Sequence, residues 1–254
     1  MTIHTATIDG VLTIEIARPE KKNALTLAMY EAMADALDAA VADASVRAVL
    51  IVGQPGVFTS GNDLEDFMQR PPTGEDSPVW RFLNALLDCD KPVLAAVTGA
   101  AIGVGTTMLL HCDFVYVSDE SRLAMPFVGL GLVPEFASSL LIPRLMGQAK
   151  AAEKLLLGDP FTAAEAVECG IANAVLPAAE VVPHARRVAA RFKALPPGAV
   201  RDTKRLLRGA EGAAVDAAMR AEGEVFSRRL RGAEAMEAFR AFFEKRKPDF
   251  SKFN

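Results

Sequence analysis

Two short runs of consecutive apolar residues constrain the fold most strongly. RAVLIVG covers residues 47–53 and PVLAAVTG covers residues 92–99. A strand with one wet face alternates apolar and polar residues, whereas a strand covered on both faces is apolar throughout. A third strand-like run, DFVYVSD at residues 113–119, follows an apolar, helix-like stretch that ends at His111. Buried strands that alternate with helices predict an α/β fold.

The rest of the chain divides into an N-terminal hairpin, further helices and a helical tail. Residues 2–17 alternate around Asp9-Gly10, which predicts a hairpin turn. Thr26 is placed to cap a helix that runs to about Asp43. Helices are also expected over residues 79–87, 149–157 and 163–168. No strand signal follows Val175-Leu176, and from about Gly198, after Pro196-Pro197, the chain is helical in pattern. We therefore predict a core of residues 1–197 and a helical segment of residues 198–254 that packs on the core or on a neighbouring subunit.

Composition excludes several classes of protein. The formal net charge of -4 argues against a nucleic-acid partner. Residues 93–112 carry no formal charge, but their glycines, threonines and change of period favour a strand, a turn and a helix over a membrane span. The three cysteines and three histidines are dispersed, which predicts no metal site and no disulfide framework. With no signal-peptide pattern at the N-terminus, we expect a cytoplasmic protein that does not engage the membrane.

Two loops after the apolar runs contain many small residues. They are FTSGND at residues 58–63 and GAAIGVGTT at residues 99–107. Ligands gather at the carboxyl ends of strands in open α/β sheets, and small residues let the backbone approach a ligand closely. The second loop lacks both the third glycine of a dinucleotide fingerprint and the lysine of a phosphate loop. A pair of backbone donors for an oxyanion is one interpretation, and tight packing alone is the other.

Four motifs in order resemble the crotonase family, also called the enoyl-CoA hydratase/isomerase superfamily. They are FTSGNDL, AAVTGAAIGVGTT, CDFVYVSD and MPFVGLGLVPE, and the similarity extends from the hairpin to FFEKRKPDF near the C-terminus. The resemblance implies a crotonase-like spiral of ββα units with a helical C-terminal trimerisation part. It also implies an acyl-CoA thioester substrate, no separate cofactor because coenzyme A is part of that substrate, and a homotrimer or dimer of trimers.

The resemblance also assigns roles to single residues. The backbone N–H groups of Ser60 and Val104 match the family's oxyanion hole, with Val104 at a position where glycine is usual. Asp63 has a structural alternative as a helix N-cap, and Lys245, with Lys247, has one as a solvated basic tail. The residues that match the family's contacts to coenzyme A are Lys22, Ala24, Leu25, Asn62, Asp63, Leu64 and Lys245.

The departures from the family pattern indicate the reaction. The two glutamates of family hydratases are replaced here by Thr107 and Phe127, and neither can transfer a proton as a carboxyl does. Glu135, in GLVPEFASS at residues 131–139, is the only charged residue between Leu123 and Pro143. It matches the single catalytic glutamate of the Δ3,Δ2-enoyl-CoA isomerases of this superfamily. An apolar setting is expected to raise its pKa and strengthen it as a base.

Three functions are therefore kept in view. The first is an isomerase that shifts a 3-enoyl-CoA double bond to the 2-position with one glutamate, in the breakdown of fatty acids or related acids. The second is a hydratase, or another crotonase-type activity, in which Glu135 acts with water. The third is a non-catalytic acyl-CoA binder, with Glu135 at a loop tip or helix start. Four residues are candidates for either the acyl pocket or ordinary core packing: Phe127, Phe136, Met68 and Trp80.

Overall fold

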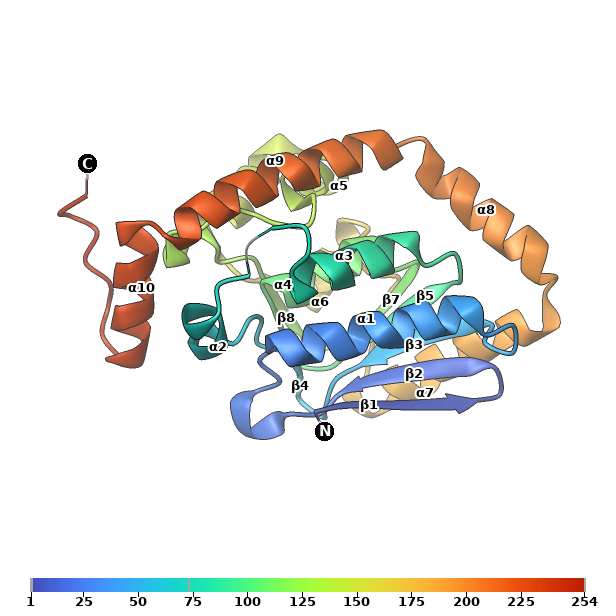
Figure 1. Ribbon diagram of the computed structural model, residues 1–254. Helices are drawn as coiled ribbons and strands as arrows, with labels where there is room; N and C mark the ends of the chain where they lie inside the picture. Colours follow the sequence, from blue (N-terminus) through green and yellow to red (C-terminus); the bar gives the residue numbers. More distant parts are fainter. Residues whose placement is uncertain (1, 73, 254) are drawn as a thin grey trace.

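A six-stranded sheet forms the centre of the molecule (Figure 1). The computed structural model describes residues 2–72 and 74–253. The first two strands of the sheet are antiparallel, and every later neighbour is parallel. In spatial order the strands are β1 (Ile3–Ile8), β2 (Val11–Ile16), β3 (Ala48–Val52), β5 (Val93–Val97), β7 (Phe114–Ser118) and β10 (Ala174–Leu176).

The predicted hairpin and the predicted doubly covered strands are confirmed. Asp9 and Gly10 have φ values of 52° and 78°, the left-handed pair that a two-residue hairpin turn requires. Every residue of β3 and β5 is buried. In β3, Val49 and Ile51 join one hydrophobic core while Leu50 joins the other, as the period of two in a strand dictates.

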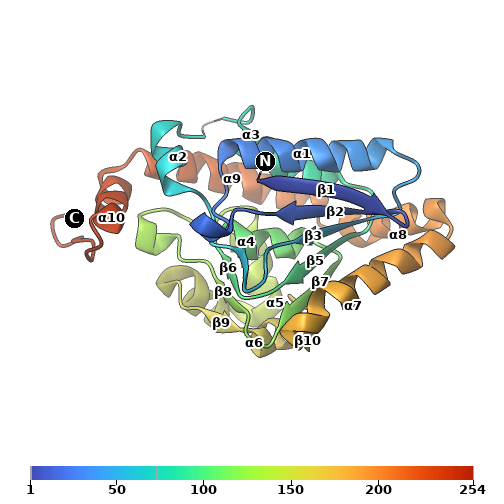
Figure 2. The same ribbon diagram turned by 90° about the horizontal axis from the view of Figure 1, so that it is seen from below.

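A second, smaller sheet stands beside the first (Figure 2). After β3, β5 and β7 the chain leaves the large sheet, adds a short strand to the small one and then enters a helical segment. This repeat is the expected spiral of ββα units. The small sheet contains β4 (Val57–Thr59), β6 (Ala100–Ile102), β8 (Arg122–Ala124) and β9 (Phe161–Thr162) in that order.

Helices cover both faces of the large sheet. On one face α1 and α3 pack against each other and join the larger core. On the other face α7 packs on β3, β5 and β7 and forms the smaller core. The helices before the tail are α1 (Leu27–Ala42), α2 (Leu64–Gln69), α3 (Pro78–Asp88), α4 (Val104–Thr107), α5 (Ser138–Ala152), α6 (Ala163–Glu168) and α7 (Ala178–Ala190). Five short helical turns are η1 (Pro19–Lys21), η2 (Met108–His111), η3 (Val128–Leu130), η4 (Glu153–Leu157) and η5 (Arg191–Ala194).

The helix expected over residues 149–157 is the end of a longer element. It begins at Ser138 as α5 and bends at Gly147, where φ is 77° and ψ is 158°. Its last turn, η4, is a π-helical turn. The other expected helices lie where predicted. Thr26 accepts a hydrogen bond from the Met29 N–H and caps α1, and Thr162 and Glu165 form the predicted capping box.

The tail consists of three helices, of which α9 crosses the top of the molecule in Figure 1 while α8 descends on the right and α10 on the left. Helix α9 buries Met219, Phe226 and Leu230 against the core, whereas Leu206 and Leu207 on α8 are 80% and 78% exposed. No strand follows Leu176 in the part of the chain that the structure describes. Within that part, no helix is long and apolar enough to cross a membrane. The tail helices are α8 (Pro197–Gly209), α9 (Gly212–Leu230) and α10 (Ala233–Phe243).

Candidate active site

The two glycine-containing loops lie against each other because β4 pairs with β6. Val57 is opposite Ala100 and Thr59 is opposite Ala101. A Cβ added to Gly105 would lie 2.5 Å from the Thr59 methyl carbon, and one added to Gly61 would lie 2.9 Å from the Ile102 carbonyl oxygen. Glycine is therefore required at both positions for the loops to approach this closely.

The backbone N–H groups of the first loop have different roles from those expected. The Ser60 N–H, which matches the family's oxyanion hole, donates a 3.1 Å hydrogen bond to the Lys22 carbonyl and is therefore occupied in this structure. The backbone of Leu25 pairs with the two residues that flank Asn62. The Leu25 N–H donates to the Gly61 carbonyl, and the Asp63 N–H donates to the Leu25 carbonyl. The Asn62 N–H therefore points away from Leu25, and it has no partner among the described residues.

Val104 supplies a second unpaired donor. It is the first residue of α4, and the first N–H groups of a helix have no partner within the helix. No other described group accepts from its N–H. The N–H groups of Asn62 and Val104 thus come from two adjoining loops, and a pair of this kind is the arrangement that binds an oxyanion.

A buried tyrosine fixes Asn62. The hydroxyl of Tyr30 on α1 donates a hydrogen bond to the Asn62 side-chain oxygen, and Tyr30 itself is fully buried. Burial, and after it the charge of Glu135, raise the pKa of Tyr30 well above its usual value. Tyr30 therefore connects the first loop to the segment that carries Glu135.

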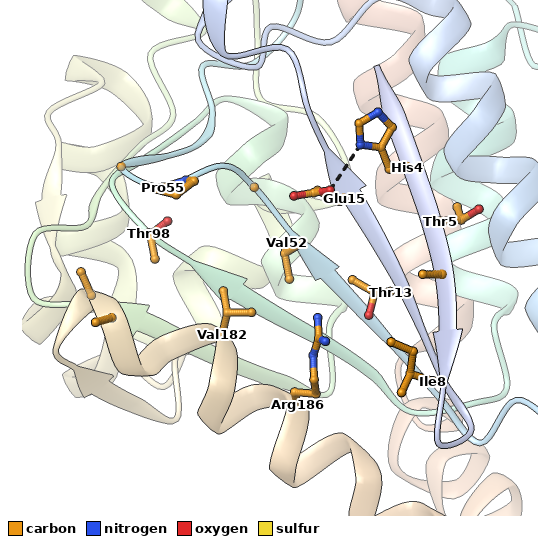
Figure 3. Close-up of a pocket in the computed structure, with 15 residues that line it drawn as sticks. His4, Thr5, Ile8, Thr13, Glu15, Val52, Pro55, Thr98, Val182 and Arg186 are labelled. Atoms are coloured by element: carbon orange, nitrogen blue, oxygen red, sulfur yellow. Dashed lines mark hydrogen bonds and ion pairs between the residues drawn. The ribbon is translucent and has the colours of Figure 1, made fainter. Parts of the chain in front are cut away.

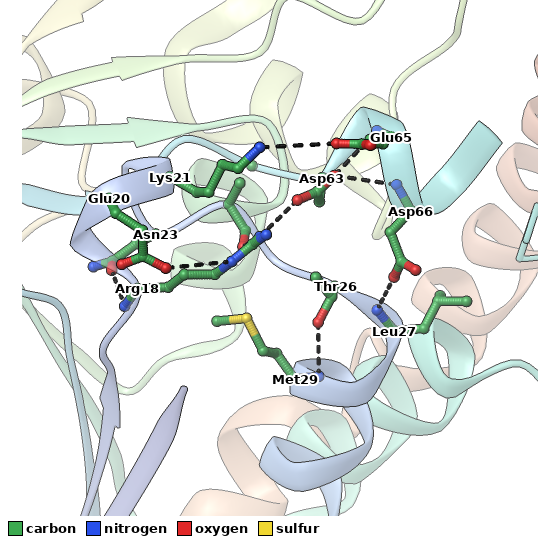
Figure 4. A network of polar contacts seen from close by, with 12 residues as sticks. Arg18, Glu20, Lys21, Asn23, Thr26, Leu27, Met29, Asp63, Glu65 and Asp66 are labelled. Carbon is green, nitrogen blue, oxygen red and sulfur yellow. Dashed lines mark hydrogen bonds and ion pairs between the residues drawn. The ribbon is translucent and has the colours of Figure 1, made fainter. Parts of the chain in front are cut away.

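Most of the residues assigned to coenzyme A have structural roles that the sequence did not show in full. Figure 4 shows Asp63 at the centre of a polar network, where it caps α2 and forms a 2.6 Å ion pair with Arg18. Burial alone would raise the pKa of Asp63, but hydrogen bonds from Arg18 and the α2 amides lower it. The Leu25 side chain is fully buried, and Leu64 packs against the same core.

The remaining assigned residues lie at the surface or near it. Lys22 is exposed and Ala24 half-buried, and the Ala24 carbonyl accepts a 2.9 Å hydrogen bond from Arg18. Lys245 is exposed and lies just after α10. Its side chain makes no hydrogen bond or ion pair with any residue described.

Sequence reasoning missed Asn23, which organises the first loop. It is buried with a φ of 55°, and its side-chain amide donates to the carbonyls of Val57 and Phe58. The Arg18 N–H donates to its side-chain oxygen at 2.7 Å. Asparagine tolerates the left-handed conformation and bonds to nearby backbone, so an asparagine after two lysines was the available signal.

Glu135 is buried, and its charge acts on Tyr30, the residue that bonds to Asn62 of the first loop. Glu135 is 8% exposed, and one carboxyl oxygen, Oε1, has no hydrogen-bond partner among the described residues. Burial, and after it the charge of Glu222, raise the pKa of Glu135 to about 8. The predicted direction of the pKa is therefore confirmed. The alternative of an exposed loop tip is wrong, although Glu135 does lie three residues before α5.

The turn after Glu135 is unusual and tightly held. Phe136 and Ala137 both have left-handed φ values, 60° and 55°. The His111 ring stacks on Phe136 at a centroid distance of 3.8 Å, and its Nε2 lies 2.8 Å from the Phe136 carbonyl. Burial lowers the pKa of His111 to about 4, so the ring is neutral and its Nε2–H donates to that carbonyl. The Ser138 hydroxyl donates to the Glu135 carbonyl at 2.6 Å.

A cavity of about 40 Å³ adjoins Glu135. Trp80 and Phe136 line it, whereas Phe127 and Met68 do not. Thr107 and Phe127, the residues in place of the hydratase acids, are both buried. Other apolar residues along the cavity are Phe67, Val79, Leu83, Met219 and Phe226.

A larger cavity of about 550 Å³ lies elsewhere, between the hairpin and α7 (Figure 3). His4, Glu15 and Arg186 are its ionisable lining residues, and His4 lies 3.3 Å from Glu15. None of the predicted site residues lines this cavity. In the described chain, no group of three or more side chains is arranged to hold a metal ion.

A buried carboxyl with an unpaired oxygen, together with two unpaired backbone donors, is suited to proton transfer next to an oxyanion. The family model described as Enoyl-CoA hydratase/isomerase matches residues 6–253. The chain therefore belongs to the enoyl-CoA hydratase/isomerase family, as its motifs predicted.

Relatives within the family carry both isomerase and hydratase names. The chain is 36% identical to human enoyl-CoA delta isomerase 2 over 83% of its length, and 30% identical to the 2,3-dehydroadipyl-CoA hydratase of Escherichia coli over 94% of both chains. It spans only 55% of the human protein and 62% of its rat counterpart. The structure of Pseudomonas aeruginosa OdaA is 52% identical, covers 95% of this chain and 98% of its own, and superposes with a TM-score of 0.93.

Proposed function

We propose that the protein is an isomerase that moves the double bond of a 3-enoyl-CoA to the 2-position. The observation that carries the proposal is Glu135, a buried carboxyl with a raised pKa and an oxygen without a partner. The residues that replace the two hydratase acids, Thr107 and Phe127, leave the reaction to this single carboxyl. The human and rat relatives named as delta isomerases support the same choice.

In the proposed mechanism Glu135 acts as the only base. As a carboxylate it takes a proton from C2, which is acidified by the neighbouring thioester carbonyl. The electron pair of the broken C2–H bond moves to the thioester oxygen and leaves a dienolate; protonation at C4 then re-forms the carbonyl and places the double bond between C2 and C3. The N–H groups of Asn62 and Val104 stabilise the resulting dienolate, with Asn62 in place of Ser60 because the Ser60 N–H is already bound. Protonated Glu135 then returns the proton to C4.

Coenzyme A is part of the substrate in this proposal, and no separate cofactor takes part. Lys22, Ala24 and Lys245 remain proposed contacts because they are accessible. Leu25 and Asp63 are buried and engaged, so we propose that they shape the site rather than touch the ligand. A cytoplasmic location agrees with three free cysteines, and a trimer or dimer of trimers would cover the exposed leucines of α8.

Hydration is the second candidate because relatives named as hydratases match nearly the whole chain. In that reaction Glu135 would activate a water molecule, and another group would have to protonate the carbon. The structure offers hydroxyl and phenyl side chains at the two family acid positions. A non-catalytic acyl-CoA binder is the third candidate function. It does not explain why a buried oxygen of Glu135 has no hydrogen-bond partner.

A paired assay distinguishes the three candidate functions. Wild type, Glu135→Gln and the exposed control Glu31→Gln receive a 3-enoyl-CoA, and formation of the conjugated 2-enoyl product is followed. The same proteins receive a 2-enoyl-CoA, and loss of its conjugated absorbance is followed. Isomerisation that collapses only in Glu135→Gln supports the proposal. Rapid hydration by the wild type would favour the second function, and binding without turnover of either substrate would favour the third.

A further inference from the structure

A second buried carboxylate holds the turn that carries Glu135. Glu222 lies on α9, more than 80 residues further along the chain, and is buried. Its Oε2 accepts a 2.6 Å hydrogen bond from the Ala137 N–H, and its Oε1 accepts a 2.8 Å hydrogen bond from the Ser139 N–H. Both oxygens thus bind the backbone directly after Glu135.

These two hydrogen bonds satisfy groups that the local sequence leaves open. Ala137 is the N-cap residue of α5 and has no side-chain oxygen to cap the helix. Phe136 and Ala137 are also in the left-handed region, which is unfavourable for residues other than glycine. Glu222 therefore caps α5 from another helix and stabilises a backbone conformation that the turn would not keep alone.

The charge of Glu222 also faces the candidate base. Glu135 and Glu222 line the same small cavity. Tyr30 faces Glu135 from α1, and His111 contacts the turn from η2, but burial keeps Tyr30 in its neutral phenol form and His111 as neutral imidazole. Trp80 on α3 carries no charge. Glu222 is therefore the charged group whose field raises the pKa of Glu135.

We propose that Glu222 is a positioning residue: the α9 carboxylate fixes the turn that carries Glu135 and, by its negative charge beside the cavity, keeps Glu135 a strong base. This inference rests on the proposed isomerase function. Glu222 does not touch the reacting carbons in this scheme and acts only through Glu135. Burial raises the pKa of Glu222, and the hydrogen bonds that its two oxygens accept from the Ala137 and Ser139 N–H groups oppose that rise by favouring its ionised form.

The test is a pH profile of isomerisation for Glu222→Gln. Glutamine keeps one acceptor oxygen and nearly the same volume, but it loses the charge and presents an N–H to one of the two backbone donors. We expect kcat to fall by about 10²-fold, as for a small misplacement of a reacting group, with little change in KM. The acid limb of kcat/KM should also move to lower pH, because removing the negative charge makes Glu135 easier to ionise.

Two further variants complete the experiment. Glu224→Gln changes an exposed glutamate on the same helix and should behave as wild type. Glu222→Asp keeps the charge but is one methylene shorter, so kcat should fall while the acid limb stays in place. If Glu222→Gln does not fold, judged by Trp80 fluorescence, an unchanged kcat in Glu222→Asp would overturn the inference.

The outcomes separate this inference from the proposed function. A wild type that does not isomerise refutes the function itself. A wild type that isomerises, with a Glu135→Gln variant that does not, supports the function whatever Glu222 does. In that case a Glu222→Gln variant with an unmoved acid limb overturns the inference alone, because a merely structural role would lower kcat without changing the pH dependence.

Discussion

Burying Glu135 should destabilise the protein at alkaline pH, and Glu135→Gln should remove that cost. The pKa is about 8 in the folded protein and 4.5 for an ordinary glutamate. The folded state therefore binds the proton more tightly than the unfolded state does. The stabilisation from this proton is complete below pH 4.5, declines as the pH rises and is lost once the pH exceeds about 8.

The size of the effect follows from the difference between the two pKa values. Each pH unit between them changes the free energy of unfolding by about 1.4 kcal/mol. Glutamine has nearly the same shape and does not titrate. The difference in unfolding free energy between Glu135→Gln and wild type should therefore grow by about 3–5 kcal/mol from pH 4.5 to pH 9, in favour of the variant.

Guanidinium unfolding followed by fluorescence measures this difference well. The chain has a single tryptophan, Trp80, and it lines the cavity beside Glu135. Wild type, Glu135→Gln and the exposed control Glu31→Gln would be unfolded at pH 5, 7 and 9. The control should show no growing difference from wild type. If the stability difference for Glu135→Gln is the same at pH 5 and pH 9, the carboxyl does not titrate in the folded protein as the structure implies.

Three other perturbations test the site by activity and packing. In wild type, kcat/KM for isomerisation should rise with pH through about 8, because Glu135 acts only after losing its proton; a flat profile from pH 6 to 9 would contradict this. Val104→Pro removes one proposed oxyanion donor at the first position of a helix, which tolerates proline, and kcat should fall by about 10²–10³-fold. The control Val104→Ala keeps the N–H, and its kcat should stay near that of wild type. Gly223→Ala would place a Cβ 2.5 Å from the Trp80 ring, so it should cost about 1–3 kcal/mol of stability, measured by thermal melts, and change the preferred acyl length, measured by chromatographic competition assays. Gly209→Ala adds a Cβ with no neighbour within 4 Å and should change neither stability nor acyl preference.

The parts of the fold that the sequence predicted correctly are those with local causes. The hairpin turn at Asp9-Gly10 needs two left-handed residues, and Asp-Gly supplies them. The capping threonines Thr26 and Thr162 lie next to the helices that they cap. Unbroken apolar runs report burial on both faces without any knowledge of the neighbours.

The parts that were missed depend on partners far away in the chain. The start of α5 carries no local signal, because its N-cap is an alanine and its cap comes from Glu222. The choice between Ser60 and Asn62 as oxyanion donor depends on which N–H the carbonyl of Lys22 occupies. Family resemblance located the loop, but only the hydrogen bonds of the folded chain distinguish neighbouring N–H groups within it.

The strongest support for Glu135 as the base is a comparison with the other buried acids. Among the described residues, four carboxylates are buried, and three of them are fully engaged. Asp63 binds Arg18 and the α2 amides, Glu222 binds two backbone N–H groups, and Glu237 binds Arg246. A structural carboxylate is held by such partners because burying it without them is costly.

Glu135 is the exception, and the proposed reaction explains it. A carboxyl that takes a proton from C2 and returns it at C4 needs an oxygen that no hydrogen bond already occupies. It also needs a backbone that does not move while the proton does, which the contacts of His111, Ser138 and Glu222 with the adjoining turn provide. An unpaired side chain on a turn held by these hydrogen bonds is costly for stability alone, and it is what a one-base proton shuttle requires.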